Sequence, residues 1–281
     1  MTTMNLLHAE LLKARKQQIN IFLVLIITFV AVFFHGWLVI AAKVNPSYIK
    51  DAEVFLPYYN SLNLSVKVIS FFSSIIAIVF VANSVGGEYS QDTWKMILPR
   101  YGSRIKFITT KLIVGLLAMI LLYLLGVTSW LALSAFSYWL LDLNPPPQVL
   151  LTLKNGLPVS NSLKTLVLEM FSMSFYGSLT LLATIGARSF PGGILGGSVS
   201  SLLMTTATII PSKYVSLSLP SLHIANLSAQ WMQNKKEIEA VAMAFRGNVS
   251  MSVSLVIVLA YITCFIITAL LLFQKRDMAG H

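Results

Sequence analysis

The stretch INIFLVLIITFVAVFFHGWLVIAA, residues 19–42, contains no Asp, Glu, Lys or Arg. As an α-helix it is long enough to cross the roughly 30 Å of hydrocarbon in a bilayer. Lys13, Arg15 and Lys16 precede it, as basic residues precede the apolar part of a secretory signal peptide. That apolar part is only about 7–15 residues long, so the stretch predicts a membrane-spanning helix instead.

Five further apolar runs follow along the chain. They cover residues 68–87, 112–141, 165–187, 190–212 and 250–273. None alternates apolar and polar side chains with the period of two that a membrane barrel needs, and backbone amides in hydrocarbon must be satisfied internally. We therefore expect an all-α integral membrane protein with six transmembrane helices, forming a single domain over residues 1–281.

The composition favours the same class of protein. Hydrophobic residues make up 56% of the chain and charged residues 11%, whereas a soluble domain carries about 25% charged residues. A net charge of +10 would suit nucleic acid if Lys and Arg gathered on one face, but here they lie in short tracts between apolar runs. We expect contact with membrane lipids and no nucleic-acid binding.

The distribution of Lys and Arg predicts the orientation. If both termini are cytoplasmic, the inner segments hold eleven of the 20 Lys and Arg residues in about 60 residues, against nine in about 85 outside. The sequence therefore predicts a multi-pass protein of the cell (inner or plasma) membrane with both ends inside. In the longest outer segment, residues 234–245 are rich in helix formers and predict a short extracytoplasmic helix.

Motifs of catalysis are missing from the sequence. It has no phosphate-binding loop, no His-Glu-x-x-His and no Gly-x-Ser-x-Gly. Its histidines are far apart, and we expect His35, inside the first span, to bond a neighbouring helix rather than a metal. The single cysteine, Cys264, cannot form a disulfide or a thiolate cluster within the chain. We expect no enzyme activity, metal site or bound cofactor in this chain.

The segment after the second run, GGEYSQDTWKMILPR, residues 86–100, is more than a tether. Residues 88–98 can form a helix that lies along the membrane face, either as an interfacial anchor for lipid phosphates or as a docking segment. Residues 5–16 likewise predict an elbow helix in the inner interface. Its amphipathicity is imperfect, because Glu10 falls near the apolar arc and Leu12 lies off it.

Together these segments resemble the permease subunits of the ABC transporter type-2 (exporter) family. The residues that carry the resemblance lie before span one, between spans two and three, and after span six: Glu10 and Lys13; Gly87-Glu88-Tyr89; Thr93-Trp94-Lys95; Leu98-Pro99-Arg100; Ser103-Arg104; Lys111; and Phe273 with Lys275-Arg276-Asp277.

The resemblance implies an ATP-driven exporter that works by alternating access. A second permease copy or a related permease would complete it, and a cytoplasmic ABC ATP-binding subunit would bind ATP and Mg. Residues 88–98 would form the coupling helix. The implied contacts with the ATPase are Glu88, Trp94, Lys95, Arg100 and Arg104, with Glu10 and Lys13 beside them.

Two features inside the spans are also candidates. Gly192, Gly193, Gly196 and Gly197 form overlapping small-xxx-small pairs, which permit close helix packing within the chain or at a subunit interface. Glu169, in the fourth span, is either part of a substrate path with Met173 or a carboxylate that reaches toward Lys164 or water.

Two other functions compete. One is an ABC-type membrane subunit that couples ATP hydrolysis to lipid or peptide extraction, to surface assembly or to metal-site maturation. The other is an ATP-independent channel or carrier, which would be expected to line its spans with more polar residues than this chain has. The sequence does not specify a substrate.

Overall fold

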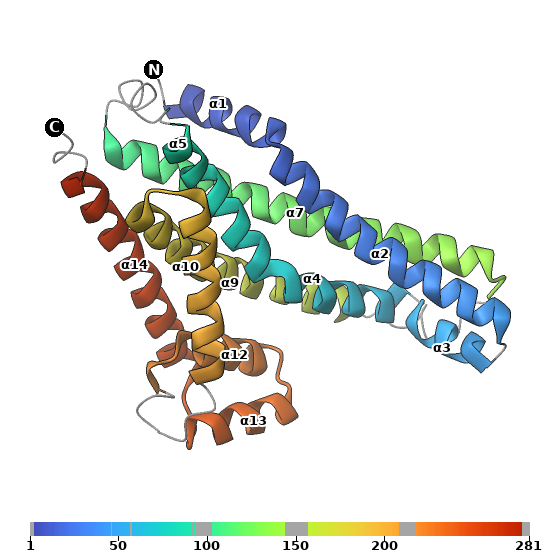
Figure 1. Ribbon diagram of the computed structural model, residues 1–281. Helices are drawn as coiled ribbons and strands as arrows, with labels where there is room; N and C mark the ends of the chain where they lie inside the picture. Colours follow the sequence, from blue (N-terminus) through green and yellow to red (C-terminus); the bar gives the residue numbers. More distant parts are fainter. Residues whose placement is uncertain are drawn as a thin grey trace. The chain divides into compact units, whose positions relative to one another are not determined.

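The computed structural model describes residues 3–45, 47–56, 58–91, 93, 103–143, 157–207 and 217–276. Within these ranges every regular element is a helix and no strand occurs (Figure 1). Long apolar runs favour helices in a bilayer because a helix satisfies its own backbone hydrogen bonds. The prediction of an all-α membrane protein is confirmed.

Five helical stretches are long and apolar enough to cross a membrane. They are Gln18–Val44, Phe72–Ser90, Ile105–Leu140, Leu163–Ala187 and Met251–Lys275. They belong to α2 (Gln18–Val44), to α4 (Tyr58–Val81) with its continuation, to α7 (Arg104–Leu140), to α9 (Leu157–Ala187) and to α14 (Met251–Arg276). The run at 190–212 corresponds to α10 (Phe190–Thr206), whose 17 residues fall short of that length, so a sixth span stays a prediction.

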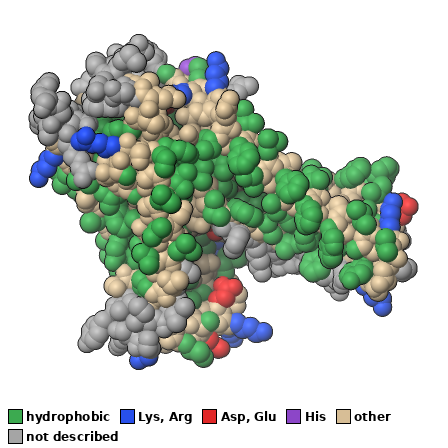
Figure 2. All heavy atoms as spheres, in the orientation of Figure 1, with side chains coloured by type: hydrophobic (Ala, Val, Ile, Leu, Met, Phe, Trp, Pro, Cys, Tyr) green, Lys and Arg blue, Asp and Glu red, His purple; other side chains and the backbone are tan. Residues whose placement is uncertain are grey.

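The outer face of α2 shows why the chain is a membrane protein. Phe22, Leu25, Phe29, Phe33 and Ile40 are 59–66% exposed and recur at helical spacing. A soluble protein rarely leaves so long an apolar stripe in water, so this face suits lipid. Among the described residues, Figure 2 shows large areas of hydrophobic side chains and few charged ones on the visible face.

The second span ends in an irregular helix. After α4 comes a π-helix, η1 (Ala82–Gly86), and then one more turn, α5 (Gly87–Ser90). The N–H of Gln91 donates to the Gly87 carbonyl at 3.2 Å, and the N–H of Thr93 donates to the Glu88 carbonyl at 3.1 Å. Of the helix expected over residues 88–98, the structure describes residues 88–90 as the last turn of the second span and places Gln91 and Thr93 in turns, and residue 92 lies outside the described ranges. The rest of that helix stays a prediction. Residues 94–102 lie outside the described ranges.

A tight turn joins α9 to α10. Arg188 adopts a left-handed conformation with φ 52°, and the Ser189 hydroxyl accepts the N–H of Gly192 at 3.1 Å, which caps the next helix. Pro191, in the first turn of α10, has no N–H that needs a partner. The turn fixes where α10 begins.

The shorter helices flank the spans. α1 (Thr3–Lys16) covers the expected elbow helix, and α13 (Lys235–Phe245) covers the helix expected at 234–245. The sequence did not predict α3 (Ser47–Phe55) or α12 (Pro220–Trp231). The position of α1 at a membrane interface stays a prediction.

The contacts divide the chain into two compact units. The first contains Met1–Lys16, Ser74–Met119 and Val167–His281, and the second contains Gln17–Ser73 and Ile120–Leu166. One division falls between α1 and α2 and the other three fall inside α4, α7 and α9, so the units are interleaved along the sequence. The single permease domain over residues 1–281 stays a prediction.

The core of the second unit brings α2, α3 and the end of α7 together. Leu38, Ala52 and Leu56 are buried in it, and the Ser134 hydroxyl donates to the Leu56 carbonyl at 2.7 Å. His35 is buried beside Trp130 of α7, with ring centroids 5.0 Å apart. It is thus a core residue packed on a neighbouring helix.

Candidate functional site

Four charged side chains from three segments meet in the first unit. Glu10 and Lys13 come from α1, Glu88 from α5 and Lys111 from α7. The Lys111 ammonium donates to Glu10 Oε2 at 2.8 Å and to Glu88 Oε1 at 2.5 Å, and Lys13 donates to the same Glu88 oxygen. We call these four residues the ion-pair cluster.

Most of the ion-pair cluster is hidden from solvent. The side chains of Lys111, Glu88 and Glu10 are 2%, 4% and 9% exposed, whereas Lys13 is 39% exposed. Two carboxylates face two ammonium groups, so the formal charges balance. A buried charge without a partner is costly, and the pairs therefore hold the three segments together.

Helical spacing places these groups. Glu10 and Lys13 are three residues apart and so share a face of α1. On α7, Lys111 lies one turn beyond Phe107 and Ile108, which are both buried. The Lys111 ammonium is also 5.5 Å from the centroid of the Phe107 ring, a favourable cation–π distance.

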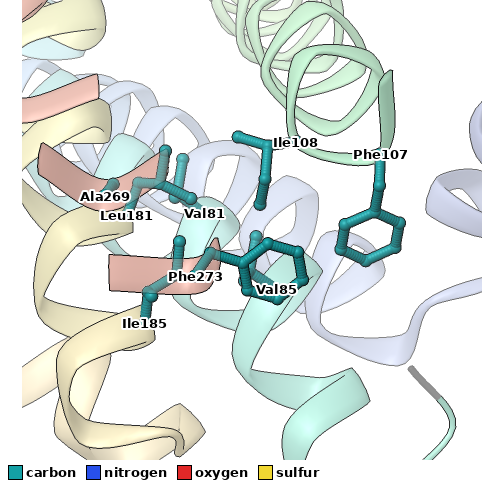
Figure 3. Close-up of a cluster of buried hydrophobic side chains, with 8 residues drawn as sticks. All are labelled: Val81, Val85, Phe107, Ile108, Leu181, Ile185, Ala269 and Phe273. Atoms are coloured by element: carbon teal, nitrogen blue, oxygen red, sulfur yellow. The ribbon is translucent and has the colours of Figure 1, made fainter. Parts of the chain in front are cut away.

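A hydrophobic cluster, drawn in Figure 3, adjoins the ion-pair cluster because its member Phe107 lies beside the Lys111 ammonium. It gathers buried side chains from four spans: Val81, Val85, Phe107, Ile108, Leu181, Ile185, Ala269 and Phe273. Phe107 stacks on Phe273 of α14 at 5.9 Å between centroids, and Tyr89 contacts the same ring edge-on at 6.4 Å. Because such interiors are close-packed, these contacts hold α7, α9 and α14 and the end of the second span in one core.

The π-helix η1 packs directly on α10. A Cβ added at Gly86 would lie 2.6 Å from the Cα of Phe190, so only glycine permits this approach. Single-turn π-helices often occur at functional sites. Here the irregular turn lies immediately before Glu88.

The structure brings only some of the predicted ATPase contacts together. Glu10, Lys13 and Glu88 meet, and the two carboxylates are buried and pair with Lys111. Contact of these three residues with an ATPase stays a prediction. Arg104 begins α7, and its side chain is not described. Trp94, Lys95 and Arg100 lie outside the described residues.

Sequence reasoning underestimated Lys111, which is the centre of the cluster. The sequence shows it only as a lysine directly before an apolar run. The ammonium group of such a lysine either reaches water or pairs with a carboxylate inside the protein, and a single sequence does not distinguish the two cases. Its partner Glu10 is 101 residues away.

The four glycines of α10 contact the chain itself. A Cβ at Gly193 or Gly197 would meet the hydroxyls of Thr184 or Thr180 on α9, at 2.2 and 2.5 Å. Cβ atoms at the other two, Gly192 and Gly196, would meet the side chains of Ala187 and Ala183 of α9 at 2.3 and 2.6 Å. These glycines allow α9 and α10 to approach closely, and a subunit interface at them stays a prediction.

The possible substrate-path residues lie on α9. Met173 is 2% exposed and lines an apolar pocket, and Glu169 is half-buried one turn before it. Among the described residues, no group of three His, Cys, Asp or Glu side chains could hold a metal ion.

A buried polar network joins α12 to the start of α14. His223 Nε2 is 2.9 Å from the Leu217 carbonyl and Nδ1 is 3.0 Å from the Ser254 hydroxyl. Since a carbonyl only accepts, Nε2 carries the proton and Ser254 donates to Nδ1. Burial lowers the pKa of His223, and the hydrogen bond to Leu217 opposes this in part. The network fixes α12 to the beginning of the last span.

Comparison with known proteins points to one family. A family model described as "ABC-2 family transporter protein" matches residues 6–190 of the 281. This range contains all four residues of the ion-pair cluster. No curated protein matches the chain.

Proposed function

The chain belongs to the ABC-2 family of transporter proteins and is a membrane permease component, and from this premise we propose that it is the transmembrane subunit of an ATP-driven exporter. A separate cytoplasmic ATP-binding subunit hydrolyses ATP, with its own bound Mg. A second permease copy or a related permease completes the transporter. Both termini of this chain lie in the cytoplasm.

The ion-pair cluster is the observation that carries the proposal. The loop between spans two and three joins the candidate spans Phe72–Ser90 and Ile105–Leu140, so Glu88 lies at the end of the second span and Lys111 in the second turn of the third. Lys111 donates to Glu88 at 2.5 Å and to Glu10 of α1 at 2.8 Å, and Glu88 also accepts from Lys13 of α1. A force applied to the loop therefore acts on α1, span two and span three together.

The roles of the residues follow from this arrangement. Trp94, Lys95, Arg100 and Arg104 form the docking surface for the ATPase. The ion-pair cluster holds that surface to the spans as positioning residues, and the hydrophobic cluster passes the motion to α9 and α14. Closure of the ATPase pair then rotates the spans between inward-open and outward-open arrangements as a rigid-body switch.

Purification of the chain with its native partners tests the proposal. We expect an ABC ATP-binding protein to co-purify, and the complex in vesicles to show ATP-dependent movement of at least one amphipathic fluorescent tracer. Glu88→Gln should keep the ATPase bound but weaken the coupling of hydrolysis to movement. Absence of any ATP-binding protein from the purified complex would refute the proposal. Binding and hydrolysis without tracer movement would favour a mechanical coupling subunit instead.

A further inference from the structure

The first unit contains an apolar pocket of about 240 Å³. It lies between α4, α7, α9 and α14, and its walls include Val81, Leu116, Met119, Met173, Gly177 and Ile262. An apolar cavity of about 150 Å³ in another protein stays dry and binds benzene. The pocket is thus large enough for a stretch of hydrocarbon.

The polar groups of the pocket wall are already satisfied. Among the described residues that line it, Ser174 and Ser178 are the two with hydroxyls. Ser174 donates to the Met170 carbonyl at 2.6 Å and Ser178 donates to the Phe175 carbonyl at 2.8 Å, both within α9. The wall offers no free proton donor to a polar ligand, whose desolvation would then be uncompensated. The occupant is therefore apolar where it lies inside the pocket.

The pocket opens on the lipid-facing side of α7. Ile113 lines it and is 49% exposed, and it lies within the candidate span Ile105–Leu140. An empty space there would forfeit dispersion contacts, and the molecules that surround the opening are lipid chains. Entry from the bilayer is thus more favourable than entry from water.

A positively charged residue, Lys106, lies on the same exposed face of α7 as the pocket residue Ile113. Lys106, Thr109 and Ile113 are all exposed and, at spacings of three and four residues, lie on one face of the helix. Lys106 and Ile113 are about 10 Å apart along the axis at 1.5 Å per residue. A phosphate near Lys106 would place the chain attached to it at the mouth of the pocket.

We propose that this pocket binds one acyl chain of a bilayer phospholipid whose phosphate lies at Lys106. The positive charge of Lys106, about 10 Å along α7 from the opening, favours a phospholipid over an uncharged apolar molecule. The site depends on the membrane-spanning helices alone, so it stands whether or not the chain works with an ATPase.

Photolabelling of the intact chain tests the site. The protein is placed in phosphatidylcholine vesicles with a trace of phosphatidylglycerol that carries a diazirine in the middle of one acyl chain. After illumination, we expect adducts to be enriched at Met119 and Met173 relative to Leu202, which is 65% exposed on α10. Equal labelling of all three positions would overturn the proposal, and this measurement needs no variant.

Two matched variants sharpen the test. Ser174→Leu fills the pocket and should lower labelling of Met119 about tenfold, which corresponds to 1.4 kcal/mol. Ser172→Leu makes the same change on α9 outside the pocket wall and should leave labelling unchanged. Lys106→Gln should lower labelling by the phospholipid but not by a diazirine-bearing alkane. If Met119 is labelled equally in Ser174→Leu and in the unsubstituted protein, the acyl chain does not lie in this pocket.

Discussion

Replacing Lys111 with Met should destabilise the protein far more than replacing Lys13 with Met. Both lysines bond to Glu88, so the chemical change is the same. Lys111 is 2% exposed and also pairs with Glu10, whereas Lys13 is 39% exposed. Without Lys111, Glu10 loses that partner inside the protein.

The magnitudes follow from burial. Removing one partner of a buried ion pair costs about 3–5 kcal/mol. We expect a loss of about 3 kcal/mol for Lys111→Met, at the lower end, because Lys13 still compensates Glu88. A largely exposed pair contributes about 0–1 kcal/mol, so Lys13→Met should cost less than about 1 kcal/mol.

The measurement is the free energy of unfolding in mixed micelles, obtained by SDS titration for each variant. Adding Glu88→Gln to Lys111→Met should give a loss smaller than the sum of the two single losses, because the two residues are in contact. Equal losses in the free energy of unfolding for Lys111→Met and Lys13→Met would show that water reaches the ion-pair cluster. The buried cluster would then not hold α1, α5 and α7 together.

Three further outcomes are expected. In the SDS titration, Gly86→Ala should lower the free energy of unfolding by about 1–3 kcal/mol, because the added Cβ would overpack against the backbone of α10. Gly87→Ala should leave it nearly unchanged, because a Cβ there would lie 3.8 Å from its nearest neighbour. The pKa of His223 is lowered chiefly by burial, so the folded protein disfavours the protonated imidazole. The contribution of His223 to stability should be complete above pH 6.5 and should decrease as the pH falls from 6.5 toward the lowered pKa. In melting scans, His223→Leu should lose this dependence of stability on pH. Charge reversal of Arg100 and Arg104 should abolish co-purification of the ATPase while the protein still inserts in the membrane, and unchanged binding would move the docking surface elsewhere.

The spans were predictable because hydropathy is a local property of the sequence. The charge-free run at 19–42 became α2, and the run at 250–273 became α14. The run at 190–212 became a helix that ends at Thr206 within the described residues. The helices α3 and α12 were missed, because neither is long enough to give a strong periodic signal.

The partners within the candidate site were not predictable from spacing. The sequence shows Glu10 near the apolar arc of the first helix and Leu12 off it, which looks like imperfect amphipathicity. The structure gives the reason, since Glu10 is buried against Lys111 and Leu12 is 45% exposed. A charge on an apolar arc was the available signal, but its partner lies 101 residues away and no local pattern identifies it.

The side of the membrane on which residue 94 lies decides whether the loop between spans two and three can meet a cytoplasmic ATPase. A Trp94→Cys variant is made together with Cys264→Ala, because Cys264 is the sole cysteine of the chain and is exposed. We predict that an impermeant maleimide added to intact cells leaves residue 94 unlabelled, that it labels this residue after permeabilisation, and that bound ATPase protects it. Labelling from outside intact cells would contradict the account, because the loop between spans two and three could not then receive force from a cytoplasmic ATPase.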